Sequence, residues 1–145
     1  MTTVNGRTGA QLIVQIGNGA SPEVFTADCL INTTRGIAFS SSTQEDIVPD
    51  CDNPEDPAWV EITKDGLKAT VTGAGKLHVD SIATWDDWFA SDDAKNVRFL
   101  VSSKGYWQGA FKLTEWTPAD NPDRKEKVNA SITLASHGAV TWTAL

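Results

Sequence analysis

Most of this chain alternates apolar and polar residues with a period of two, the pattern of a half-buried β-strand. The alternating segments contain many β-branched and aromatic residues, which favour strands. Several of them are bounded by Gly, Pro, Asn or Asp, which form turns. We therefore expect a mainly β fold of two packed antiparallel sheets, arranged as a sandwich or a barrel-like pair. The predicted strand segments are 10–16, 23–40, 59–73, 97–102, 105–116, 127–136 and 139–145. In the second of these, Ala27–Asp28 and Gly36 are candidate breaks.

One of these segments, WVEITKDGLKATVTG at residues 59–73, is predicted to form a hairpin by itself. Residues 64–66 (KDG) would make its turn. Val60 and Ile62 would share one face on the first arm, and Leu67, Ala69 and Val71 would share one on the second.

A single helix is predicted over residues 81–94, SIATWDDWFASDDA. Apolar residues recur there at helical spacing, and Ser81 is a suitable N-cap. The opposite face carries acidic residues, so the helix should be amphipathic and lie against the sheets. The residues expected to pack into the core are Ile82, Trp85, Trp88 and Phe89.

A long loop is predicted over residues 41–58. Within QEDIVPDCDNPEDPAW, residues 44–59, six residues are acidic, three are proline and none is basic. Loops longer than about 12–15 residues are uncommon in compact domains and are usually functional or disordered. The six acids are Glu45, Asp46, Asp50, Asp52, Glu55 and Asp56.

The charge distribution argues against nucleic-acid binding. Residues 36–63 contain seven acids and no Lys or Arg, so this window alone accounts for the net charge of −7 of the whole chain. Tight binding to phosphates requires clustered cations that displace counterions. Here the cations are scattered, apart from RKEK at residues 124–127.

No catalytic or metal-binding motif is evident. An EF-hand loop that began at Asp50 would place Pro54 at its fifth position and Glu55 at its sixth, where oxygen and glycine are needed. An irregular cation site in this loop stays open as an alternative. His78 and His137 lie outside any hydrolase or zinc-protease motif. We expect no enzymatic activity, no metal and no cofactor.

The N-terminal residues MTTVNGRTGAQ lack the layout of a signal peptide, and no apolar run approaches the roughly 18 residues of a membrane span. We therefore expect one domain, residues 1–145, made in a reducing cytoplasm with Cys29 and Cys51 as free thiols. Six tryptophans could form a sugar-stacking platform, which leaves a carbohydrate-binding β-sandwich as an alternative. Core or interface positions are favoured instead.

The last predicted strand, residues 139–145, has no charged side chain that would protect a free sheet edge. Assembly into a ring removes such an edge, since head-to-tail contacts that close a rotation leave none free. The predicted residues of this subunit-edge strand are Val140, Trp142 and Leu145.

Nearly end to end, the sequence resembles the tail tube proteins (major tail proteins) of phages with long non-contractile tails and of gene transfer agents. The resemblance rests on the order of several short patterns: GR before LIVQI, FTADCLINTTRGIAFSSS, a long variable loop, WVEIT before VTGAG, the helix, GYWQGAFKLTEW and the terminal SITLASHGAVTW.

The resemblance implies a structural virion protein whose six-membered rings stack into a hollow tube for DNA. Its partners would be copies of itself, the tape measure, the tail terminator and distal tail or baseplate proteins. The long loop would reach the adjacent ring, where a basic patch could receive it, and would order only on assembly. A distal-tail or baseplate-hub ring protein is the alternative within the same particle. Candidate residues of the basic patch are Lys64, Lys68, Arg124, Lys125 and Lys127.

Overall fold

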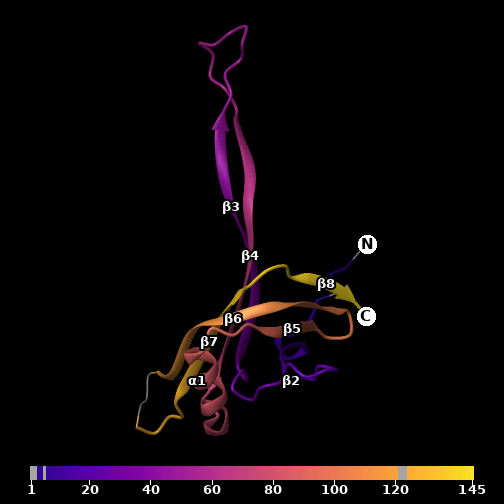
Figure 1. The fold of residues 1–145 in the computed structure, drawn as a ribbon, viewed down its shortest axis with the longest axis vertical. Helices are drawn as coiled ribbons and strands as arrows, with labels where there is room; N and C mark the ends of the chain where they lie inside the picture. The colour runs from indigo at the N-terminus through magenta and orange to yellow at the C-terminus, as the bar shows by residue number, and fades with distance from the viewer. Residues whose placement is uncertain (1–2, 5, 121–123) are drawn as a thin grey trace.

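The computed structural model describes residues 3–4, 6–120 and 124–145. Over these residues, two 3-10 turns, η1 and η2, and one α-helix accompany eight strands (Figure 1). The bounds of the helical elements are η1 Gly9–Gln11, η2 Val79–Ser81 and α1 Ile82–Ala90. The strands are β1 Leu12–Gly17, β2 Phe25–Ala27, β3 Thr34–Ile47, β4 Val60–Lys76, β5 Lys95–Val101, β6 Gly105–Asp120, β7 Asn129–Ser136 and β8 Thr141–Ala144.

All strand pairings are antiparallel, and hydrogen bonds link the eight strands into one sheet in the order β2-β1-β5-β6-β7-β4-β3. The strand β8 also pairs with β6. The prediction of a mainly β, antiparallel fold with one helix is confirmed. The two expected layers are halves of this one sheet, which share β6 and pack against each other. Phe39 on β3, for example, lies with its ring centroid 5.7 Å from that of Trp107 on β6.

The hydrophobic core lies between these halves and beneath α1. Val14 and Phe99 enter it from one half, and Val71 and Leu134 from the other; all four are at most 3% exposed. Loop residues Leu30 and Ile31 complete it. Burial of alternate residues along β5 and β7 confirms the period-two pattern that predicted these strands.

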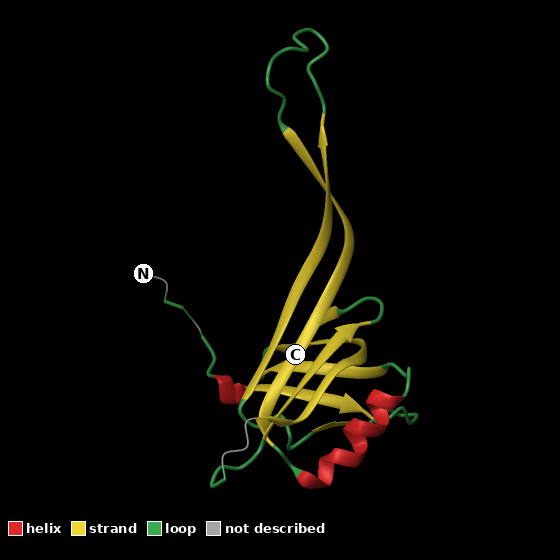
Figure 2. Ribbon diagram, turned by 90° about the vertical axis from the view of Figure 1, so that its left-hand side faces the viewer, coloured by secondary structure: helices red, strands yellow, loops and turns green. Residues whose placement is uncertain are grey.

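The helix α1 packs on β6 at one end of the sheet (Figure 2). The buried Trp85 stacks on Trp88 at 5.6 Å and on Trp116 of β6 at 6.1 Å between ring centroids. The helix is shorter than predicted and ends at Ala90, where the Ser91 hydroxyl and amide both donate to the carbonyl of Trp88.

Two details of this helix differ from the prediction. Ser81 occupies the N-cap position, but its hydroxyl donates to Asp28 Oδ1 at 2.9 Å instead of capping the helix. Ile82 is partly buried, whereas Phe89 is 48% exposed and lies outside the core. The buried stripe centres on Trp85 and Trp88, and Phe89 lies about 100° around the helix from Trp88.

The predicted hairpin at residues 59–73 is wrong. The strand β4 runs without a turn through Lys64, Asp65 and Gly66, and its hairpin partner is β3. The predicted loop is correspondingly shorter: residues 41–47 belong to β3, so the connection spans only residues 48–59. The KDG sequence that suggested a turn forms a β-bulge, in which Ser42 pairs with Gly66 and Thr43 with Lys64.

Candidate assembly surfaces

The strands β3 and β4 extend far beyond the rest of the sheet (Figures 1 and 2). The strand β7 pairs with β4 only from Thr70 to Lys76, so the outer part of the β3–β4 ribbon has two strands. We call residues 40–68 the arm and its end, residues 48–59, the tip. Eight residues of β3 lie in the arm, which at about 3.3 Å per residue makes its paired part about 26 Å long.

The aliphatic side chains of the arm all lie on one of its two faces. Directly opposed residues in a strand pair lie on the same face, and successive pairs alternate. One face carries all the aliphatic side chains of the paired arm and is called the apolar face; the opposite face is called the polar face. The apolar face holds Leu67, Ile62, Val60 and Ile47 together with Ser41, Thr43, Lys64 and Glu45. The polar face holds Ser40, Lys68, Ser42, Gly66, Gln44, Thr63, Asp46 and Glu61.

The apolar face continues the row of side chains that fills the core. Val71 and Ala69 are buried, and Leu67 follows on the same face with 80% exposure. Farther out, Ile62 is 62% exposed and Ile47 is 67% exposed.

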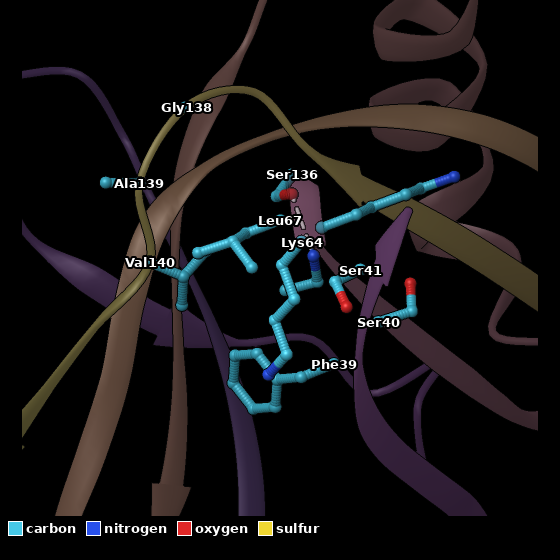
Figure 3. A pocket seen from close by; sticks show the side chains of 11 residues that line it. Phe39, Ser40, Ser41, Lys64, Leu67, Ser136, Gly138, Ala139 and Val140 are labelled. Atoms are coloured by element: carbon cyan, nitrogen blue, oxygen red, sulfur yellow. Dashed lines mark hydrogen bonds between the residues drawn. The ribbon is translucent and has the colours of Figure 1, made fainter. Parts of the chain in front are cut away.

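At the base of the apolar face, β8 turns away from β4 and leaves a groove of about 750 Å³. Leu67 and Phe39 line it from the ribbon and Val140 from the β7–β8 connection (Figure 3). The Ser136 hydroxyl accepts a hydrogen bond of 2.9 Å from the amide of Ala69, which extends the β4–β7 ladder at its end nearest the arm. Lys64 and Lys68 also line the groove, so its wall is both apolar and cationic.

The tip carries four of the six predicted acids, namely Asp50, Asp52, Glu55 and Asp56; Glu45 and Asp46 lie on β3 beside it. All six are exposed. Hydrogen bonds within the tip form turns. The amide of Asp52 donates to Asp50 Oδ1 at 3.0 Å, and the amide of Asp56 donates to the carbonyl of Asn53 at 3.1 Å. Trp59 at its end is 92% exposed.

The predicted basic residues fall into two separate places. Lys64 and Lys68 lie on β4 in the arm, whereas Arg124, Lys125 and Lys127 lie in the β6–β7 connection. The structure therefore brings the first two together at the groove and places the other three elsewhere.

The last strand forms an edge, as its sequence suggests, but it is shorter than predicted: β8 spans Thr141–Ala144, so Val140 and Leu145 flank the strand and only Trp142 lies in it. Of the strands in the described part of the chain, only β6 pairs with β8. Trp142 is 46% exposed and its ring lies 4.7 Å from that of Trp107, with the planes tilted by 55°. Val140 is partly buried against the core, and Leu145 is 73% exposed.

The tryptophans do not form one flat platform. Trp85 and Trp88 belong to α1 and are buried, while Trp59 and Trp142, the exposed ones, lie at the tip and on β8. Over residues 3–4, 6–120 and 124–145, no group of three or more His, Cys, Asp or Glu side chains is arranged to hold a metal ion. Cys29 and Cys51 are exposed free thiols. No helix in this part of the chain has the length and apolar character needed to cross a membrane.

Sequence reasoning missed the groove and the apolar face, because it assigned Val60 and Ile62 to one arm of a separate hairpin. The available signal was a change of phase: apolar residues occupy even positions at Val60 and Ile62 but odd positions from Leu67 onward. Such a change within one strand indicates a bulge.

The sequence pattern of phage tail tube proteins matches residues 7–142, nearly the whole chain. This chain belongs to the phage tail tube protein family. It is a structural subunit of a tail tube and thus a component of a virion or phage-like particle.

Solved structures share the fold of this tail tube protein. A chain from the tail of an empty gene transfer agent particle, reconstructed with C6 symmetry, has a TM-score of 0.75 at 18% identity, over 96% of this chain and 100% of that chain. A chain from the virion of a native gene transfer agent has a TM-score of 0.73 at the same identity and coverage.

A more distant structure has the same fold. A chain from the sheath–tube complex of an extracellular contractile injection system has a TM-score of 0.64 at 14% identity, over 97% of this chain and 93% of that chain. All three come from multi-subunit tail or injection assemblies. No curated protein has a sequence that matches this chain significantly.

Proposed function

We propose that this tail tube protein forms six-membered rings that stack into a hollow tube, through which DNA passes during delivery without specific binding. The observation that carries this proposal is the arm, a two-stranded ribbon that leaves the body with apolar side chains exposed. An isolated two-stranded hairpin is at best marginally stable in water. Contact with other copies would give this arm a surface to pack on. Copies of this one-domain chain would make up the whole tube wall. The chain would have no catalytic activity.

In this proposal the acidic tip contacts a copy in the adjacent ring. Its charge needs a cationic partner, and two candidate patches exist: Lys64 with Lys68 at the groove, and Arg124, Lys125 and Lys127 in the β6–β7 connection. The variants Lys64→Glu and Arg124→Glu separate them. The patch that receives the tip is the one whose charge reversal weakens assembly.

The overall charge suits a conduit for DNA. A ring of six copies carries a formal charge of 6 × −7 = −42. Acidic groups on the inner wall would repel phosphates within a Debye length, about 8 Å at physiological salt. A cationic wall would instead retain DNA through counterion release. The tape measure, tail terminator and distal tail proteins would bind the tube at its inside and its ends.

Replacing tip residues 48–59 by Asn-Gly tests the proposal. Asn-Gly closes tight hairpins, and it would join the Ile47–Val60 pair directly. We expect a folded subunit, with unchanged far-UV circular dichroism, that no longer forms long hollow filaments in negative-stain electron microscopy. The unmodified chain should form them. Filaments from the tip-less variant would refute the role of the tip, and single rings from the unmodified chain would indicate a distal-tail or baseplate ring protein instead.

A further inference from the structure

The bulge at Asp65 keeps the apolar residues of the outer arm in phase with those of the core. Counted along a regular strand, Val60 and Ile62 would lie on the face opposite to Leu67 and Ala69, because they differ by an odd number of positions. The register shows otherwise: Ile62 pairs with Glu45 and Leu67 with Ser41, and both pairs lie on the apolar face. Asp65 is the extra residue that absorbs the change of phase.

The bulge therefore places the aliphatic side chains of the arm in one row from the core to the tip, interrupted between Leu67 and Ile62 by the Thr43–Lys64 pair. Phe39 at its base is 52% exposed and Val60 near its end is 48% exposed, with Leu67, Ile62 and Ile47 at 80%, 62% and 67%. Together these five side chains expose the equivalent of about three whole side chains, on the order of 300 Å² of apolar surface. Soluble monomers rarely expose apolar patches larger than a few hundred Å², and their largest patch is often functional.

From this we infer that the apolar face of the arm, phased by the bulge at Asp65, is buried against a second copy of this chain. The inference rests on the proposed function and deepens it, since it names the face through which the subunits associate. The face continues directly from the core, and its base is the groove, in which Leu67 and Val140 leave a space of about 750 Å³ for the side chains of the neighbouring copy.

Other occupants fit less well. The arm's own tip carries the exposed Trp59 and Val48 but lies at the far end of the ribbon from the groove (Figure 1). A small molecule would fill the groove and leave Ile62 and Ile47, farther along the arm, uncovered. A second copy can cover the whole row, and repeated contacts of this kind generate a ring or a filament.

Two adjacent residues of β4 provide a matched test, because Ile62 lies on the apolar face and Thr63 on the polar face. Each is exposed in the free subunit, so neither Ile62→Lys nor Thr63→Lys should change its thermal unfolding by more than about 2 °C. The critical concentration for assembly is measured by sedimentation. We expect Ile62→Lys to raise it at least tenfold and Thr63→Lys to change it less than threefold.

Deletions test the role of the bulge. Removing Asp65 alone makes the ladder regular and leaves Val60 and Ile62 on the apolar face, so assembly should persist. Removing Asp65 and Gly66 together moves Val60 and Ile62 to the polar face, so assembly should be lost while the body stays folded. The two deletions differ by one residue, and the single deletion thus controls for damage to the strand.

The outcomes separate this inference from the function on which it rests. If the unmodified chain does not assemble, the proposed function fails. If it assembles and Ile62→Lys behaves like Thr63→Lys, or if both deletions behave alike, the tube proposal stands and the apolar face is not the interface.

Discussion

Replacing two leucines on the same side of the sheet by alanine should affect two different quantities. Leu134 on β7 is 0% exposed in the free subunit, whereas Leu67 on the arm is 80% exposed. Leu134→Ala should therefore lower the stability of the subunit, and Leu67→Ala should weaken its association with other copies.

The magnitudes follow from burial. A buried Leu→Ala substitution lowers the free energy of unfolding by about 2–5 kcal/mol, which for a chain of this length lowers Tm by roughly 3–4 °C per kcal/mol. At Leu67 the substitution removes three carbons, worth about 2.4 kcal/mol if fully buried. Four fifths of that surface is still exposed in the free subunit, so assembly should lose about 2 kcal/mol per contact, roughly a 25-fold rise in critical concentration.

Both effects can be measured on the same two variants. Differential scanning calorimetry at concentrations below assembly gives the stability of the subunit, and sedimentation of the assembled fraction gives the critical concentration. The reasoning would be refuted if Leu67→Ala lowered Tm as much as Leu134→Ala does, or if it left the critical concentration unchanged.

Two further predictions concern the loop at residues 28–33, which is fixed against the sheet. Asp28 Oδ1 accepts hydrogen bonds from the Leu30 amide at 2.8 Å and from the Ser81 hydroxyl at 2.9 Å. Ser81→Ala should therefore lower the free energy of unfolding by about 1 kcal/mol and Asp28→Ala by about 2 kcal/mol in urea titrations, and equal losses would contradict this. At Gly75 an added Cβ would lie 2.6 Å from the carbonyl oxygen of Leu30 and closer still to Asn32, whereas at Gly36 the nearest atom, Thr72 Oγ1, is 3.7 Å away. Gly75→Ala should therefore cost about 2 kcal/mol or more, while Gly36→Ala should change stability by less than about 1 kcal/mol, measured in the same way.

The sequence predicted the body of the fold well because burial there follows local periodicity. Alternation located β5 and β7, and the spacing of Trp85 and Trp88 located the helix. Phe89 was misplaced because helical spacing defines a face but not its width, which depends on the element beneath it.

The arm was mispredicted for a different reason. Lys-Asp-Gly satisfies the local chemistry of a tight turn and that of a bulge, and the change of apolar phase across it fits both unless the segment is known to be one strand, which pairing with β3 establishes. Pairing with β3 across the tip extends β4 to seventeen residues, and this pairing cannot be read from the β4 segment alone. The same pairing brings Leu67, Phe39 and Val140 together at the groove, which no local pattern could indicate.

Cryo-electron microscopy of the assembled protein tests the central claim most directly, because it shows what covers the arm. The account predicts rings of six in which Ile62 and Leu67 are buried against a neighbouring copy while Thr63 stays exposed to solvent. Tubes in which the apolar face of the arm is open to solvent, with subunits joined entirely through other surfaces, would contradict it.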